Sequence, residues 1–60
     1  MNWKQALKYM SEGGSICRKS WLVNDYLYAD KGVIKDDGGN VYKGKGLEQG
    51  EWLKWTRLED

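Results

Sequence analysis

The sequence contains no histidine, no phenylalanine and no proline, and it has a single cysteine. Without histidine, the most versatile general base near neutral pH is missing, which excludes nucleophile systems of the Ser-His and Cys-His kinds. One cysteine cannot form an internal disulfide, and Cys17 without histidine cannot build a zinc site of the usual type. We therefore expect no catalytic residues, no metal site and no cofactor, and hence a protein that is not an enzyme.

Charge and hydropathy exclude two further classes of protein. Ten basic and nine acidic residues leave a formal net charge of +1, which is too small for a general nucleic-acid binder that makes many phosphate contacts. No apolar run approaches the roughly 20 residues of a membrane span, and no segment resembles a signal peptide. An unpaired thiol suits a reducing compartment, so we expect a cytosolic protein in which Cys17 is a small buried hydrophobic residue.

The length of the chain limits how much surface it can bury. With 60 residues, the chain forms one domain at most, and we assign residues 1–60 to a single small domain. A chain of this length buries only about 60% of the surface of its unfolded form. Small domains gain further stability from disulfides, metals or association, and the composition leaves only association. The sequence therefore predicts a homo-oligomer.

The first segment has the pattern of an amphipathic helix. Trp3, Ala6, Leu7 and Met10 recur at i, i+3, i+4 and i+7, which places them along one face of a helix. Asn2 is a suitable N-cap, and the glycine pair at 13–14 is a typical C-terminal stop. We predict one helix over about residues 3–12, with its apolar stripe in the core.

Beyond residue 14 the chain has the composition of short strands and turns. Strands are predicted over residues 15–21, 25–29, 32–35, 40–43 and 51–58. The sequence DDGG at 36–39 favours a tight turn, so residues 32–43 are expected to form a hairpin. In the last strand, alternation puts Leu53 and Trp55 on one face and Trp52 and Lys54 on the other. The predicted fold class is α+β, with one N-terminal helix packed on a small antiparallel sheet of four to five strands.

The aromatic and cationic residues of the middle segment form the candidate binding site. All eight aromatic residues are Trp or Tyr, which suit half-buried surfaces and binding sites. The candidate ligand-binding residues are Arg18, Lys19, Trp21, Tyr26 and Tyr28. A guanidinium binds phosphate in bidentate fashion and an aromatic face stacks on a base, so this set suits a nucleotide.

An alternative interpretation of the same residues is purely structural. Arg18 would then pair with Asp25, Asp30 or Glu51, and the two tyrosines would fill a subunit interface. The lysines of the KGKG sequence at 43–46 lie in a flexible connector or at the rim of an anion site. The carboxylate pairs at 36–37 and 59–60 are interpreted as solvated surface.

The order of these segments resembles the phage Thoeris anti-defence family of the second type. The resemblance is carried by WKQALKYMSEGG, ICRKSW, NDYLYADKGVI and GEWLKW, in this order along the chain. It implies a helix packed on an antiparallel sheet, a homo-oligomer in the host cytosol, and ligand pockets at subunit interfaces. The implied ligand is a cyclic ADP-ribose derivative or related cyclic nucleotide that is sequestered without hydrolysis. Arg18 and Trp21 match the family motif best, and Trp52 joins the candidate ligand-binding residues through this resemblance.

Residues 43–50 form a loop where members of the family carry a longer insertion. In those members the insertion could line the ligand pocket, so the pocket is the part of the resemblance that this difference affects. A second hypothesis, which the Trp/Tyr-only aromatic set and the two-faced last strand favour, is a small inhibitor or adaptor that caps a host enzyme. Trp, Tyr and Arg dominate the energetics of protein interfaces, and this chain is rich in such residues.

Overall fold

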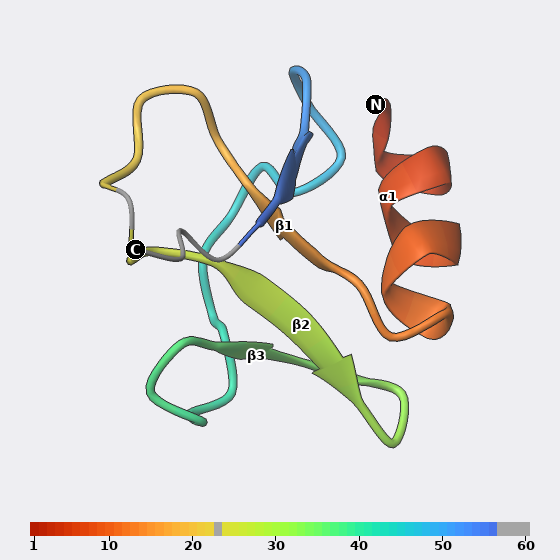
Figure 1. The fold of residues 1–60 in the computed structure, drawn as a ribbon, viewed down its shortest axis with the longest axis vertical. Helices are drawn as coiled ribbons and strands as arrows, with labels where there is room; N and C mark the ends of the chain where they lie inside the picture. The colour runs from red at the N-terminus through yellow and green to blue at the C-terminus, as the bar shows by residue number, and fades with distance from the viewer. Residues whose placement is uncertain (23, 57–60) are drawn as a thin grey trace.

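The computed structural model of the chain describes residues 1–22 and 24–56. Its elements follow the order α1 (Trp3–Ser11), β1 (Ser15–Cys17), β2 (Leu27–Asp30), β3 (Val33–Asp36) and β4 (Leu53–Trp55). The strands form one antiparallel sheet in the order β3-β2-β1-β4, and α1 packs against β1 and β2 (Figure 1). This arrangement confirms the predicted α+β class, with four strands.

Both ends of α1 are closed by local hydrogen bonds that the sequence anticipates. The side chain of Asn2 accepts from the Gln5 backbone N–H, and the Gln5 side chain accepts from the Asn2 backbone N–H, which forms a capping box. At the other end, Gly13 donates to the Met10 carbonyl and Gly14 donates to the Tyr9 carbonyl. With Gly13 at a φ of 95°, these two bonds make a Schellman motif that ends the helix.

Two tight turns shape the hairpin of β2 and β3. Lys31 and Gly32 both have positive φ, 53° and 80°, as a two-residue hairpin turn between antiparallel strands requires. At the far end of β3, the Asp36 carboxylate accepts hydrogen bonds from the backbone N–H groups of Gly38 and Asn40. The chain then turns back along β3, and Val41 forms an isolated bridge with Lys35. The turn predicted at 36–39 is confirmed, whereas the predicted strand at 40–43 is reduced to this bridge.

The other strands are shorter than the sequence predicts. β1 stops at Cys17, because the backbone N–H of Trp21 donates to the Arg18 carbonyl and closes a turn. The alternation predicted for 15–21 therefore ends at Cys17, and Lys19 and Trp21 do not continue its face. β4 covers Leu53–Trp55 of the predicted 51–58, and residues 57 and 58 lie outside the described residues.

The core lies between α1 and one face of the sheet. The helix, the two central strands and the segment before β4 all contribute fully buried hydrophobic residues. These are Ala6, Met10, Ile16, Leu27 and Trp52. Leu7 was predicted in the same stripe, but its side chain is 43% exposed. Within the described ranges, no helix has both the length and the apolar composition that a bilayer crossing requires.

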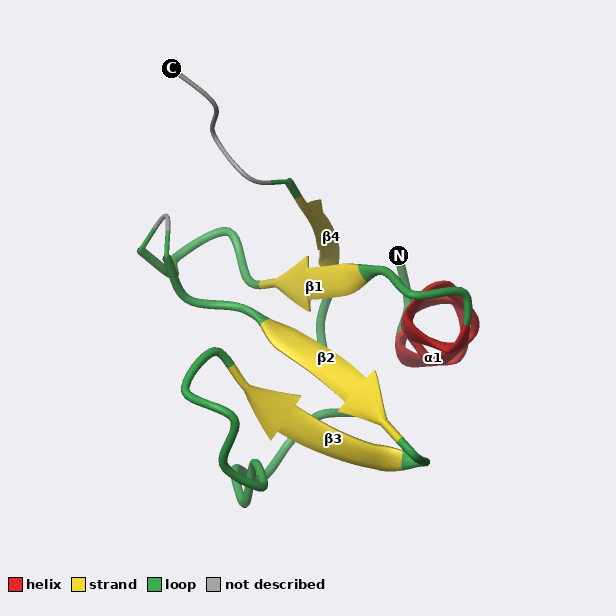
Figure 2. Ribbon diagram, turned by 60° about the horizontal axis from the view of Figure 1, so that its bottom comes forward, coloured by secondary structure: helices red, strands yellow, loops and turns green. Residues whose placement is uncertain are grey.

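The connection from β3 to β4 carries the chain from one edge of the sheet to the other. Figure 2 shows β3 and β4 at opposite edges, with β1 and β2 between them. Tyr42 and Leu47 of this connection pack against the core, so the connection and α1 cover the same face of the sheet. At its end, Trp52 exchanges backbone hydrogen bonds with Met1, with N···O distances of 2.6 and 2.7 Å.

The buried position of Ile16 gives a first prediction. Ile16 is 0% exposed, and removing three of its carbons leaves a cavity under α1. We expect Ile16→Ala to lower the free energy of unfolding by about 2–5 kcal/mol. Val41→Ala is the control, because Val41 is 53% exposed and should change stability by no more than about 0.5 kcal/mol. Urea titration followed by circular dichroism measures both, and equal effects would contradict the assigned core.

Candidate functional site

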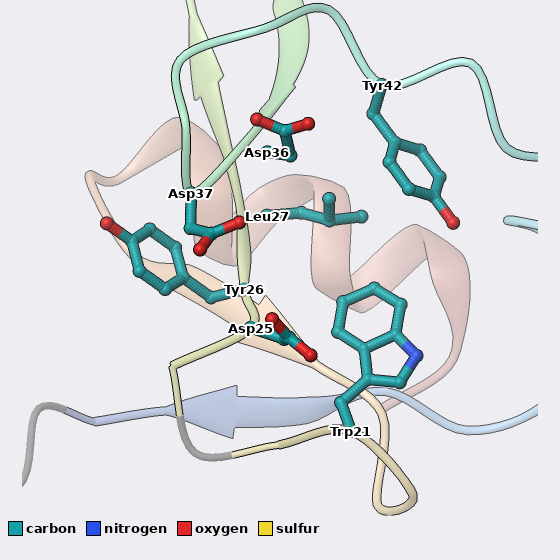
Figure 3. Close-up of a pocket in the computed structure, with 7 residues that line it drawn as sticks. All are labelled: Trp21, Asp25, Tyr26, Leu27, Asp36, Asp37 and Tyr42. Atoms are coloured by element: carbon teal, nitrogen blue, oxygen red, sulfur yellow. The ribbon is translucent and has the colours of Figure 1, made fainter.

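An open hollow of about 310 Å³ lies where the β2–β3 hairpin meets the loops that precede and follow it (Figure 3). Its lining combines aromatic rings, carboxylates and one apolar side chain, and consists of Trp21, Asp25, Tyr26, Leu27, Asp36, Asp37 and Tyr42. We take it as the candidate site.

The pairing of β2 with β3 positions the floor and the carboxylates of the hollow. Leu27 lies directly opposite Asp36 in the antiparallel register, so both side chains point to the same face of the sheet. Asp25 precedes Leu27 by two residues, and its carboxylate lies between Leu27 and Trp21 (Figure 3). Asp37 follows in the turn that the Asp36 carboxylate stabilises. The segments on either side of the β2–β3 turn thus bring three carboxylates around one leucine.

Aromatic rings form the walls of the hollow. Trp21 and Tyr42 extend toward each other from two loops (Figure 3), with ring centroids 6.4 Å apart and an interplanar angle of 50°. Tyr26 lies on the other side of the hollow, and its ring packs on Trp55 with a centroid distance of 4.1 Å. Each ring thus packs on another aromatic ring, so the walls are held by neighbours within the fold.

The hollow is electrostatically negative. Among the described residues that line it there are three carboxylates and no basic side chain. One oxygen of Asp36 is engaged by the two backbone N–H groups of its turn. For Asp25 and Asp37, no hydrogen bond or ion pair to the carboxylate is found within residues 1–22 and 24–56. A ligand in this hollow therefore meets hydrogen-bond acceptors that are ready to bind N–H or O–H donors.

Arg18 does not line this hollow and is engaged within the fold. Its guanidinium donates to the backbone carbonyls of Glu51 and Gly46, at 3.0 and 3.1 Å. The same group lies over the ring of Trp52, with Cζ 3.6 Å from the ring centroid, which is a close cation–π contact. The partner of Arg18 is thus neither a carboxylate of Asp25, Asp30 or Glu51 nor a vacant site, but two carbonyl oxygens and an aromatic face.

Trp52, which the resemblance places among the ligand-binding residues, lies in the core. Its side chain is 1% exposed, and its indole N–H donates to the Leu47 carbonyl at 2.8 Å. The ring of Trp21 meets it edge to face, with centroids 5.6 Å apart and an angle of 82°. Trp52 therefore supports the wall of the hollow from behind and has too little exposed surface to stack on a ligand.

The remaining predicted residues, Lys19 and Tyr28, do not line the hollow. Lys19 is exposed in the turn that leads to Trp21. Tyr28 lies beside Tyr26 on the face of the sheet away from α1, with ring centroids 6.3 Å apart. Of the six predicted ligand-binding residues, the hollow thus brings together Trp21 and Tyr26.

Sequence reasoning missed the acidic residues and Tyr42. Asp36 and Asp37 were interpreted as a solvated turn, and Asp25 only as a partner for Arg18. The register of β2 with β3, which places Asp36 opposite Leu27, is the signal that links them. That register follows from the two-residue turn at 31–32, which could have been read from the sequence.

The face of the sheet away from α1 carries an ion pair and the free thiol. Lys35 Nζ lies 2.9 Å from Asp30 Oδ2, and this hydrogen bond and charge raise the pKa of Lys35. Because the folded pKa lies above the unfolded one, the pair contributes stability at neutral pH, and the contribution is lost only as the pH rises through the lysine range. Cys17 is half-buried, and burial raises the pKa of its thiol.

Neither a metal site nor similarity to known proteins indicates what the hollow binds. No group of three or more His, Cys, Asp or Glu side chains in the described part of the chain is placed to hold a metal ion. Comparisons with models of known families, with curated proteins and with solved structures found no match. The candidate site therefore rests on its own geometry.

The contacts of Arg18 predict a structural effect of its removal. Arg18→Met keeps an apolar stem but loses both carbonyl bonds and the cation–π contact. We expect the free energy of unfolding to fall by about 1–3 kcal/mol. Lys19→Met is the matched control, because Lys19 is the exposed neighbour, and it should change stability by no more than about 0.5 kcal/mol. Thermal unfolding of the two variants measures the difference, and equal melting temperatures would exclude the assigned role.

The environment of Cys17 predicts slow alkylation. Since burial disfavours the thiolate and raises the pKa of Cys17, less of the reactive form is present at pH 8 than in an unfolded chain. Iodoacetamide should modify the native protein more slowly than the protein in urea, and the native rate should continue to rise above the usual thiol range. Mass spectrometry over a pH series follows the reaction, with a short peptide containing one cysteine as the reference. Native alkylation as fast as that of the peptide would show that the thiol is not shielded.

Proposed function

We propose that the protein is a phage-type counter-defence protein that binds and sequesters a cyclic nucleotide signal without hydrolysing it. The observation that carries the proposal is the hollow in which Trp21 and Tyr42 form a wall beside Leu27 and carboxylates surround the floor. Such a site offers an aromatic face to a nucleobase and acceptors to its N–H groups and to ribose hydroxyls. The confirmed α+β fold agrees with what the resemblance to the Thoeris anti-defence family implies.

The charges of the site determine which part of a nucleotide enters. Three carboxylates repel a phosphate inside the hollow, so the base and ribose bind within and the phosphates stay outside. Lys19 is exposed in the turn that leads to Trp21, where it can pair with a phosphate at the rim. This division differs from the initial expectation that Arg18 binds the phosphate, because Arg18 is engaged by Gly46, Glu51 and Trp52.

The size of the hollow bears on assembly. A volume of about 310 Å³ is at the lower end of the usual range for small-molecule sites, and holds a nucleoside better than a whole cyclic dinucleotide or ADP-ribose derivative. A second copy of the chain would cover the rest of the ligand. The proposal therefore keeps the expected homo-oligomer with pockets at subunit interfaces, in the cytosol of the host.

Nucleotide titration with a matched pair of variants tests the proposal. The probes are cyclic ADP-ribose, cyclic AMP, cyclic GMP and cyclic di-GMP, and we expect at least one to raise the melting temperature of the wild-type protein. Trp21→Ala removes a stacking face and should weaken binding of that probe by about 1–3 kcal/mol. Leu22→Ala should leave the affinity unchanged, because Leu22 is 77% exposed and does not line the hollow.

Two results would contradict the proposal. If none of the four probes raises the melting temperature at high excess, nucleotide sequestration by this chain is wrong. If a probe is recovered cleaved after incubation, the protein is an enzyme and not a sequestering protein. Chromatography of the recovered nucleotide decides the second point.

The acidic lining favours a second candidate, which is an inhibitor or adaptor that caps a host protein. Within residues 1–22 and 24–56 these carboxylates have no cationic partner, and beside aromatic rings they suit an arginine or lysine side chain of a partner. A blocked arginine amide added to the same titration distinguishes the two functions. Binding of the arginine amide without any of the four nucleotides favours the protein partner.

A further inference from the structure

We propose that Arg18 is a positioning residue for the hollow. It holds Trp21 in the wall of the hollow and does not contact the ligand. The consequence for affinity rests on the proposed function, whereas the placement of Trp21 can be measured without any ligand. The initial expectation gave Arg18 a direct role in binding phosphate, and its contacts assign it an indirect one.

A continuous series of contacts leads from Arg18 to the hollow. The guanidinium lies 3.6 Å from the ring centroid of Trp52, and Trp52 in turn meets Trp21 edge to face at 5.6 Å. Trp21 then contacts Tyr42 at 6.4 Å, and these two rings form one wall of the hollow. Trp21 therefore packs on Trp52, and Arg18 contacts Trp52 at the end of the series away from the hollow.

Arg18 also fixes both chain segments on which this series depends. Its guanidinium donates hydrogen bonds to the carbonyls of Gly46 and Glu51. These bonds hold the last part of the β3–β4 connection, which leads directly to Trp52. Through its own carbonyl, Arg18 accepts from the Trp21 backbone N–H at 3.1 Å and closes the turn that presents Trp21. A lysine cannot reproduce this arrangement, because an ammonium lacks the planar fork that binds two carbonyls while stacking on a ring.

The close approach of Gly50 to Arg18 offers a way to disturb the guanidinium without changing Arg18 itself. A Cβ atom at Gly50, whose φ is 75°, would lie 3.0 Å from Arg18 Nη1. Gly32 has a similar φ of 80°, and a Cβ atom there meets nothing within 4 Å. Gly50→Ala and Gly32→Ala therefore impose the same kind of backbone strain, but only the first adds a close contact that presses on the guanidinium.

The test combines nuclear magnetic resonance with binding. In the ¹⁵N-labelled protein, the indole N–H signal of Trp21, assigned by its loss in Trp21→Phe, should shift in Arg18→Met and in Gly50→Ala. It should stay in place in Gly32→Ala, and the signal of Trp55 should stay in place in all three. For whichever of the four nucleotide probes binds the wild-type protein, both Arg18→Met and Gly50→Ala should weaken binding about fivefold to tenfold, part of the cost of removing a stacking ring. Gly32→Ala should bind like the wild-type protein.

Each alternative result has a defined meaning. An unmoved Trp21 signal in Arg18→Met and Gly50→Ala overturns the inference, and so does a shifted signal with unchanged affinity. A loss of affinity as large in Gly32→Ala as in Gly50→Ala also overturns it, because strain alone would then be the cause. If no probe binds the wild-type protein, the proposed function fails and the Trp21 signal alone decides whether Arg18 positions this ring. If Arg18→Met does not fold, Gly50→Ala gives the answer.

Discussion

The burial of Trp52 is the interaction on which the rest of the described structure depends. A chain of this length has few fully buried positions, and Trp52 is the largest of the five side chains that occupy them. Trp3 of the helix, Trp21 of the middle loop and Arg18 after β1 all contact its ring. Because the indole N–H and the backbone of Trp52 are also hydrogen-bonded, one residue joins the helix, the sheet and both long loops.

The candidate site lies where the regular structure ends. The sheet supplies a fixed floor through the Leu27–Asp36 pair, and the loops supply Trp21 and Tyr42. Loops alone would hold such rings poorly, but here the core lies directly behind them. The site therefore combines the variability of loop residues with the rigidity of the core, as binding sites commonly do.

The elements with strong local signals were predictable from the sequence. The helix has a complete stripe, a capping asparagine and a glycine pair, and the structure shows it within one residue of the prediction. Strand lengths were not predictable, because Arg18 and the residues after it alternate like a strand but are held in a turn by tertiary contacts. Local patterns carry no information on such contacts.

The same reason explains what was found and missed in the site. Arg18 and Trp52 are noticeable in the sequence because cations and tryptophans are typical of binding sites. In the structure these two side chains contact each other and do not line the hollow. The acidic residues of the hollow looked like an ordinary turn. Only the register of β2 with β3 shows that Asp36 lies opposite Leu27. That register follows from the turn at 31–32, whereas the DDGG motif by itself predicts a turn and does not indicate what its carboxylates face.

The separation of Trp52 from Met1 along the sequence has a consequence for how the chain folds. The helix and the β2–β3 hairpin need only neighbouring residues, so they can form early. The core closes only when β4 pairs with β1 and Trp52 pairs with Met1, 51 residues away. Contacts of such long range are slow to form because the loop between them must first be ordered. The wall of the hollow therefore assembles after the hairpin, once the connection from β3 has crossed the sheet and brought Trp52 behind Trp21.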